Sequence, residues 1–455
     1  MNTPHIRRWP GYNMILRWHF YAGLLCLPFI VWLSLTGAVY LFKPQIEAAI
    51  DAPYRHIAAS PRRARPSEQV AAAVRAVPGS VLHRYQLPGS SDDAVQILVG
   101  VGAQEKRVYV HPESLSILKV VDEDKRLMRM VFNLHGELMA GAWGSYIVEL
   151  AASWTIIMIL TGLFLWWPRG AGLAGTLYPR LRGDRRRFWR DLHAVTGLWV
   201  SFFALFLLVS GLPWAKSWGA YLKTIRAVAE GQAPRQDWTT SKAEELRMRA
   251  MQDAGTRAML GEHAEHGGMA MMHPMTSYRP LDRLAITVGT LELAPPVLIA
   301  PPTGMDQPWT AKSDAANRPL RTDLKLDGAT GRVISRKDFA QRKLVDRLVG
   351  YGVAVHEGQL FGIANQIVNL MTAIGLVLMS VSSVVLWWRR RPGGTLGAPV
   401  ALSRPPMAVP FFLLIGLLAI SLPLFGATLI AVLMIERLVL SRLPPVRTWL
   451  GLRAA

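Results

Sequence analysis

A long apolar segment that follows a histidine and ends in a Trp-Trp pair occurs twice in this chain. NLHGELMAGAWGSYIVELAASWTIIMILTGLFLWW aligns with AVHEGQLFGIANQIVNLMTAIGLVLMSVSSVVLWW at an offset of 221 without a gap, so that His135 falls on His356. HFYAGLLCLPFIVWLSLTG aligns with HAVTGLWVSFFALFLLVSG at an offset of 174, so that His19 falls on His193. Each apolar run has the roughly 20 residues needed to cross about 30 Å of hydrocarbon. The sequence therefore predicts a duplicated two-helix membrane unit with a histidine near each end.

The positive charges of the chain gather at the ends of these apolar runs. Lys and Arg number 51 against 31 Asp and Glu, which gives a net charge of +20. The arginines lie at positions 7, 8 and 17, within residues 169–190, and at 389–391. This is the positive-inside pattern, and it predicts a cytoplasmic N-terminus. It explains the charge better than nucleic-acid binding does, so we expect membrane lipid and no nucleic acid as partners.

The cysteine content limits the cofactors that the chain can hold. Cys26 is the only cysteine and lies inside the first apolar run. This excludes an intrachain disulfide, haem attached through CxxCH, and a cysteine-ligated iron–sulfur cluster. No P-loop and no GxGxxG after a strand is present, so any electron donor is expected to be a separate molecule. Residues 1–16 are polar and basic, and no cleavable signal peptide is expected.

Apolar and polar segments divide the chain into membrane and aqueous parts. We expect spans at residues 19–42, 131–168, 189–214 and 351–388, with cytoplasmic segments at 1–18, 169–188 and 389–408. Residues 409–440 are apolar with Pro423 near the middle, long for one span and short for two, and 441–455 form a tail. Residues 43–130 and 215–350 are expected to be periplasmic.

Both outer segments have the pattern of small α+β domains. In the first, SEQVAAAVRAVPG is typical of a helix, and VLHRYQLP, AVQILVGVG and KRVYVHPESLSILKVV are typical of strands. In the second, LKLDGATGRVISRKDF repeats the strand–turn–strand pattern of VYVHPESLSILKVV. The expected fold is a membrane all-α core of four duplicated spans plus a C-terminal apolar segment, with two periplasmic α+β domains.

The four repeated histidines are the candidate cofactor ligands. His19 and His193 are expected near the cytoplasmic face, and His135 and His356 are expected to begin helices that descend from the outer face. A continuous helix over the 31 residues from His135 to Trp166 would be about 46 Å long, which places His135 at the outer interface. Paired imidazoles in a helix bundle typically hold b-type haem, so we predict two bis-His haems.

The residues around the histidines support a haem site more strongly for the inner pair than for the outer pair. Gly23 and Gly197 lie four residues after their histidines, on the same helix face, where a flat porphyrin could approach the backbone. The outer pair has Met139 and Leu360 at that spacing. One alternative is that the histidines are structural, and another is a di-metal site with Glu137 and Glu357 nearby. A third is a proton channel through Glu149, although the equivalent residue of the second repeat is leucine.

A second group of candidate ligands lies in an insertion of the second outer segment, residues 261–275. Thioether and imidazole groups are soft ligands suited to copper. A surface loop that is merely rich in these residues is the alternative. The candidate copper ligands are His263, His266, Met269, Met271, Met272, His273 and Met275.

The chain resembles the PepSY-associated transmembrane family. The resemblance depends on WHFYAGLLCLPFIVWLSLTG with YLFKP, LHGELMAG, DLHAVTGLW, HEGQLFG, the Trp-Trp endings and the outer hairpins, and it extends to about residue 392. It implies four core helices, two periplasmic PepSY-like domains and a Gram-negative inner membrane. Because the family includes haem-containing ferric-siderophore reductases, it also implies that His19, His135, His193 and His356 are haem ligands.

We therefore expect an inner-membrane di-haem electron-transfer protein. Its electrons would come from an unidentified donor and pass to a periplasmic acceptor, a ferric siderophore or another metal complex, which would make it a haem-dependent ferric reductase. Two alternatives remain at this point. One is a copper-handling electron-transfer protein. The other is a membrane anchor without enzymatic activity that binds or restrains a periplasmic partner through its PepSY-like domains.

Overall fold

The structure is a computed structural model that describes residues 11–58, 62–102, 104–167, 173–182, 184–230, 278–303, 307–399 and 409–452. The chain forms two compact units. The helical unit comprises Met1–Leu41, Phe132–Pro234 and Ile363–Ala455, and the sheet unit comprises Phe42–Val131 and Arg235–Gly362. Each unit is therefore assembled from segments that are far apart in the sequence.

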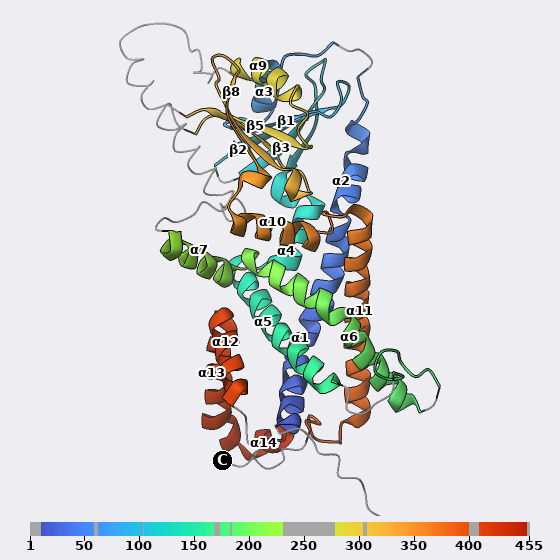
Figure 1. Cartoon of the computed structure of the whole chain (residues 1–455). Helices are drawn as coiled ribbons and strands as arrows, with labels where there is room; N and C mark the ends of the chain where they lie inside the picture. The colour runs from blue at the N-terminus through green and yellow to red at the C-terminus, as the bar shows by residue number, and fades with distance from the viewer. Residues whose placement is uncertain are drawn as a thin grey trace, which may run out of the picture. The chain divides into compact units, whose positions relative to one another are not determined.

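The helical unit contains the long apolar helices that the repeats predict. They are α1 (Tyr12–Leu41), α5 (Gly141–Trp166), α6 (Arg185–Gly211) and α11 (Gly362–Arg390) (Figure 1). Together with the segment Pro423–Arg442, they make five described helices that are long and apolar enough to cross a membrane. The chain is thus a multi-pass membrane protein, and its apolar helix faces contact lipid.

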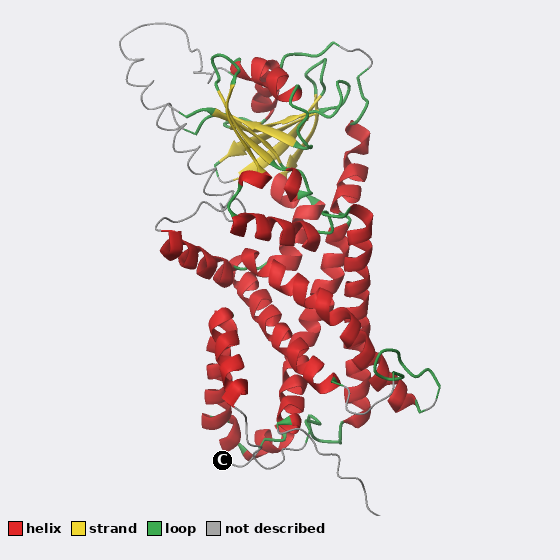
Figure 2. Ribbon diagram, in the orientation of Figure 1, coloured by secondary structure: helices red, strands yellow, loops and turns green. Residues whose placement is uncertain are grey.

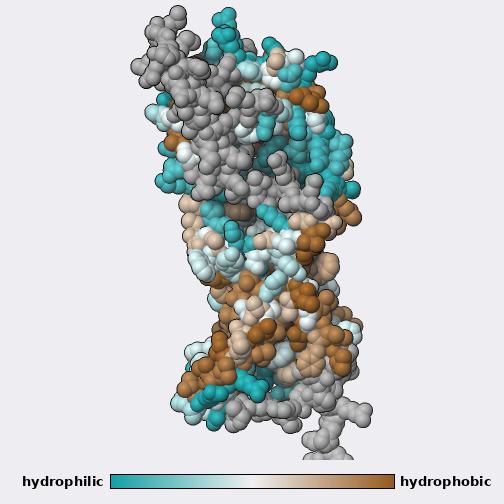
Figure 3. Space-filling view, turned by 90° about the vertical axis from the view of Figure 1, so that its left-hand side faces the viewer, coloured by the Kyte–Doolittle hydropathy of each residue, from teal (hydrophilic) through white to brown (hydrophobic). Residues whose placement is uncertain are grey.

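The surface of the helical unit supports a membrane setting. Large apolar side chains are exposed along α1, α6 and α11. Figure 3 shows another face of this unit, and its surface there is mainly brown, which marks hydrophobic residues. Trp143 near the start of α5 and Trp167 just after its end are 78% and 61% exposed. Their separation of 24 residues corresponds to about 36 Å of helix. Exposed aromatic residues at this spacing match the two headgroup regions of a bilayer.

The C-terminal apolar segment is a pair of helices rather than one span. α12 (Val409–Ser421) and α13 (Pro423–Leu438) are separated at Leu422, because Pro423 is tolerated only in the first turn of a new helix. Gly426 lies so close to Ala419 that a Cβ atom there would be 2.8 Å from its carbonyl oxygen. η6 (Leu440–Arg442) and α14 (Pro444–Leu450) follow.

The outer histidines do not begin the membrane helices, which corrects the sequence prediction. His135 lies in the last turn of α4 (Leu127–Glu137), and His356 is the last residue of α10 (Leu344–His356). Each short helix ends before the next helix starts at Gly141 or Gly362, which have φ of +57° and +58°. Only glycine adopts this left-handed conformation readily. The chain therefore turns at the same place in both repeats, and the expected continuous helix from His135 to Trp166 is wrong.

The sheet unit contains one antiparallel sheet of eight strands in the order β4-β3-β2-β1-β5-β6-β7-β8 (Figure 2). Each outer segment contributes a four-stranded meander, and the two meanders join where β1 pairs with β5, with Tyr85 opposite Ile299. The strands are β1 (Val81–Leu87), β2 (Val95–Val101), β3 (Gln104–Val110), β4 (Ile117–Asp122), β5 (Val297–Ala300), β6 (Trp309–Ser313), β7 (Thr322–Leu326) and β8 (Val333–Asp338).

Two helices at equivalent places in the meanders cover one face of the sheet. α3 (Pro66–Ala76) and α9 (Pro280–Gly289) bury Val70, Leu281 and Leu284 against the strands. Ser67 at the start of α3 donates two hydrogen bonds to Asp282 of α9, from its backbone N–H at 2.7 Å and its hydroxyl at 2.8 Å. The remaining short helices of this unit are α2 (Lys43–Asp51), η1 (Ala52–Tyr54), η2 (Glu123–Lys125), η4 (Arg318–Leu320) and η5 (Phe339–Gln341).

The strands and the helix that the sequence predicts in these segments are confirmed. Their arrangement differs from the prediction, because the two outer segments share one sheet instead of forming two separate ones. A meander of four strands leaves two unpaired edges, and pairing β1 with β5 satisfies one edge of each meander. The Met- and His-rich residues 261–275 lie outside the described residues.

Candidate functional site

His19 and His193 come together inside the helical unit. They lie on α1 and α6, each about two turns from the helix start, and their ring centroids are 6.4 Å apart with the planes at 77°. Both rings are partly buried. The structure thus places the two histidines that the first repeat pair predicts on facing helices, close enough to act on one ligand.

The ring of His19 is oriented by α5. Its Nδ1 lies 3.0 Å from the backbone carbonyl oxygen of Met158 and 3.2 Å from the hydroxyl of Thr161. A carbonyl oxygen can only accept, so Nδ1 carries the proton and donates it. The neutral ring then has its lone pair on Nε2, which is the nitrogen left for a ligand.

The ring of His193 has the same support from α11. Its Nδ1 donates to the carbonyl oxygen of Met379 at 3.2 Å, and the hydroxyl of Ser382 lies 3.4 Å away. Met379 and Ser382 stand at the repeat positions of Met158 and Thr161, at the same offset of 221. The sequence analysis missed these residues, although the repeat alignment carries the signal. A metal-binding histidine usually donates the N–H of its other ring nitrogen to an acceptor in this way.

Glycines make room beside the two rings. A Cβ atom on Gly23 would lie 3.7 Å from the sulfur of Met158, and one on Gly197 would lie 3.3 Å from the sulfur of Met379. On α5, a Cβ atom on Gly162 would lie 3.0 Å from Cε1 of His19. The role of Gly23 and Gly197 beside a porphyrin stays a prediction, and the close approach of Gly162 to His19 was not predicted.

A cavity of about 780 Å³ opens between these helices. Both histidines line it, together with Gly23 and Gly197, and most of its other walls are apolar. A volume of several hundred Å³ with few polar groups is typical of a cofactor site. The cavity lies entirely within the helical unit.

Equivalent loops close one end of the cavity. The indole N–H of Trp166 donates to the carbonyl oxygen of Thr176 at 3.1 Å, and that of Trp387 donates to Leu396 at 2.8 Å. Both tryptophans are the first of a Trp-Trp pair, and both loops contain the tripeptide Gly-Thr-Leu. Each first tryptophan therefore anchors the loop that follows it, and Ala174, Gly175, Thr176 and Pro399 of these loops line the cavity.

The outer histidines belong to different units. His135 is in the helical unit, with its Nδ1 3.0 Å from the hydroxyl of Thr36 on α1, and a Cβ atom on Gly37 would be 3.1 Å from its Cε1. His356 is in the sheet unit. The surroundings of His135 thus resemble those of His19, a hydroxyl beside Nδ1 and a glycine beside Cε1, while the pairing of His135 with His356 stays a prediction.

The inner pair fits a metal bound from two sides. Two imidazoles on opposite sides of one metal have centroids about 6 Å apart, because each metal–nitrogen bond is about 2 Å and each ring adds roughly 1 Å. The observed 6.4 Å agrees with this spacing. The centroid distance and the protonated Nδ1 atoms therefore fit a metal ion between the two rings, and the predicted haem stays a prediction.

The family follows from comparison with known sequences. Residues 16–390 match the PepSY-associated TM region, and this match covers both repeats and both outer segments. The chain belongs to this family. No curated protein matches the chain. The family predicted from the motifs is thereby confirmed, and it supports a membrane protein without specifying a reaction.

Glu149, the candidate for a proton channel, has a structural role. It is buried on α5 and accepts a hydrogen bond from the backbone N–H of Ser217 at 2.8 Å, while the neighbouring N–H of Lys216 donates to Ser145. Both N–H groups belong to the first turn of α7 (Lys216–Glu230). Glu149 therefore caps this helix, where a carboxylate also interacts favourably with the helix dipole.

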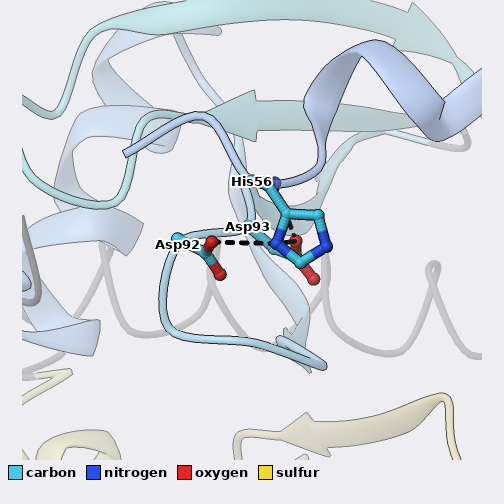
Figure 4. A group of neighbouring side chains, drawn as sticks. All are labelled: His56, Asp92 and Asp93. Atoms are coloured by element: carbon cyan, nitrogen blue, oxygen red, sulfur yellow. Dashed lines mark hydrogen bonds and ion pairs between the residues drawn. The ribbon is translucent and has the colours of Figure 1, made fainter. Parts of the chain in front are cut away.

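One other cluster of possible metal ligands occurs among the described residues (Figure 4). His56, Asp92 and Asp93 lie together in the sheet unit, with His56 Nδ1 2.8 Å from Asp92 Oδ2. The backbone N–H of His56 also donates to Asp93, and the hydrogen bond with Asp92 raises the pKa of the exposed imidazole. These bonds tie residues 52–58 to the β1–β2 loop. The predicted copper ligands of residues 261–275 lie outside the described residues.

Proposed function

We propose that this protein carries electrons across a membrane through two b-type haems and delivers them to a metal complex. One haem would be held by His19 and His193, and the other by His135 and His356. The proposed acceptor is iron(III) in a siderophore, which one electron reduces to iron(II), a form that siderophores hold less tightly. Both the acceptor and the inner-membrane location come from the resemblance to the family.

The duplicated support of the inner histidines is the observation that carries this proposal. Each Nδ1 proton is donated to a methionine carbonyl, which fixes the ring and directs the basic Nε2 to a ligand. A structural histidine needs no free nitrogen and no matching partner 6.4 Å away. Bound haem would supply reversible one-electron chemistry, and the apolar cavity would keep water from it.

The arginines of the helical unit support the proposed direction of transfer, from a cytoplasmic donor outward. α6 begins with Arg185, Arg186 and Arg187, and α11 ends with Arg389 and Arg390. By the positive-inside rule this end faces the cytoplasm, so the His19–His193 pair would receive electrons there. Reporter fusions test the assignment: a fusion within residues 169–188 should report a cytoplasmic position, and one at Ser90 a periplasmic position. The reverse result would invert the path.

The decisive experiment is the visible spectrum of the purified protein and its variants. Wild-type protein should bind about two haems per chain, and His19→Ala or His193→Ala should each remove the same one. His56→Ala is the matched control, because this exposed histidine lies in the sheet unit. A wild-type protein without haem, or four unchanged spectra after substituting each repeated histidine in turn, would overturn the proposal.

The acceptor requires its own test. Reduced protein in detergent should be reoxidised by a ferric siderophore under anaerobic conditions, and a ferrous chelator should capture iron(II) in proportion to the electrons lost. His193→Ala protein, which lacks the inner haem, should lose transfer from a donor supplied at the arginine-rich end. Haem that stays reduced when the ferric siderophore is added would exclude this acceptor and leave the haem assignment intact.

A further inference from the structure

Three arginines line the same cavity as the two inner histidines. Arg180 comes from the loop after α5, Arg190 from the second turn of α6, and Arg390 from the end of α11. The cavity is therefore polar at this end and apolar along most of its length. The inference that follows rests on the proposed function and concerns what this end of the cavity binds.

A buried carboxylate holds two of these arginines in place. Asp191 is 0% exposed and lies two residues before His193. It accepts hydrogen bonds from Nε of Arg180 at 2.6 Å and from Nη2 of Arg190 at 2.8 Å. One carboxylate between two guanidinium groups leaves one positive charge uncompensated. Asp191 thus fixes the position of a net cationic group beside the histidine pair.

Arg390 adds a second positive charge from another helix. Its Nε donates to the carbonyl oxygen of Leu386 at 3.1 Å, which leaves its other N–H groups available. Among the described residues, no acidic side chain forms an ion pair with it. With Arg180, Arg190 and Asp191, it gives this end of the cavity a net charge of +2.

We infer that Arg180, Arg190 and Arg390 bind the two carboxylates of the haem held by His19 and His193. The charges balance, since two carboxylates meet a net charge of +2. Guanidinium groups match carboxylates geometrically, because two parallel N–H groups can bond both oxygens. The ligand that fits an apolar cavity with one cationic end is a flat apolar body with its acidic groups at one edge. Asp191 is then a positioning residue, since it acts through the two arginines.

Haem and haem dimethyl ester separate this inference from alternatives, because esterification removes both negative charges and leaves the porphyrin ring unchanged. Protein from haem-starved cells is titrated with each, and binding is read from the Soret band. Wild-type protein should bind haem about tenfold or more tightly than the ester. Arg390→Gln and Arg180→Gln should each lower this preference several-fold, because each leaves a net charge of +1. Arg185→Gln is the matched control, because Arg185 lies on α6 but does not line the cavity, and it should keep the wild-type preference.

The outcomes distinguish this inference from the proposed function. If wild-type protein binds neither compound, the proposed function fails and this inference fails with it. If wild-type protein binds both equally well, or Arg390→Gln keeps the preference, the haem assignment stands and the arginines have another role. Arg390→Gln is the cleaner test, because Arg180→Gln also removes the hydrogen bonds that hold the loop after α5 to Asp191. A lipid headgroup as the true ligand of these arginines would produce this second result.

Discussion

Gly375 provides a quantitative test of how the second repeat is packed. It lies on α11 against α6, where a Cβ atom would be 2.5 Å from Cγ1 of Val200 and 3.6 Å from Cγ2 of Thr196. Carbon atoms in contact prefer about 3.5–4.0 Å, so Gly375→Ala must push the helices apart by about 1 Å or force Val200 from its rotamer. Overpacking of this kind costs about 1–3 kcal/mol.

A second glycine isolates this packing cost. Alanine favours a helix by up to about 1 kcal/mol over glycine, which partly offsets the clash. Gly416 lies inside α12 with nothing within 4 Å of its Cβ position, so Gly416→Ala changes only the helix propensity. The difference between the two variants should therefore be about 1–3 kcal/mol, with Gly375→Ala the less stable.

Thermal unfolding in detergent measures this difference. A loss of 1 kcal/mol corresponds to roughly 2–4 °C in the midpoint for a unit of this size. Val200→Ala removes the clashing methyl, so the double variant of Gly375→Ala with Val200→Ala should be more stable than the two single effects predict. Equal midpoints for Gly375→Ala and Gly416→Ala, or strictly additive effects in the double variant, would refute the proposed contact.

Three further predictions concern the site and the sheet unit. Thr161→Val and Ser382→Ala should each speed haem transfer to apomyoglobin by about 3–10-fold, since a hydroxyl is lost but the methionine carbonyl remains, and unchanged rates would exclude this support. Burial raises the pKa of Glu123, but the charge and hydrogen bond of Arg107 outweigh burial, so the pKa is lowered overall. The ion pair should therefore stabilise the fold above about pH 4.3 and lose this effect as the pH falls. Glu123→Gln should make the unfolding midpoint fall less steeply with acid, and an unchanged slope would contradict this. Deleting residues 261–275 should reduce Cu(I) binding, measured by competition with a chromogenic chelator, without changing haem content.

The repeats made the helical unit largely predictable. Spans of about 20 apolar residues have few alternatives in a membrane, and the alignment of His19 with His193 already implied a common environment. The alignment also pairs the two residues whose carbonyl oxygens support the histidines, because Met158 falls on Met379. Their role could not be predicted, since the interaction uses the backbone carbonyl, which every residue has.

The turns beside the outer histidines left one signal in the sequence, the aligned Gly141 and Gly362, which was not interpreted as a helix break. Leu138 and Met139 both have positive φ, a conformation that neither residue favours. The apolar pattern continues through them, so the sequence predicts one helix where the structure has α4 and α5. The pairing of β1 with β5 was hidden, because residues about 200 positions apart form it and no local pattern specifies which edge of each meander remains open.

The two copies have diverged where they do not contact the histidines. Trp154 of α5 stands at the repeat position of Gly375 in α11. It donates a hydrogen bond to Thr428 of α13 at 3.0 Å and packs against Phe425, so α5 supports the C-terminal helix pair. At the same position α11 has no side chain and approaches α6 closely. The copies thus use this position for different packing, yet one turn further along they keep the methionine whose carbonyl accepts the Nδ1 proton. Because any residue supplies a carbonyl, the feature that both copies share is the helix register that places this carbonyl beside the histidine. The proposed ligand between His19 and His193 would use this register from both sides.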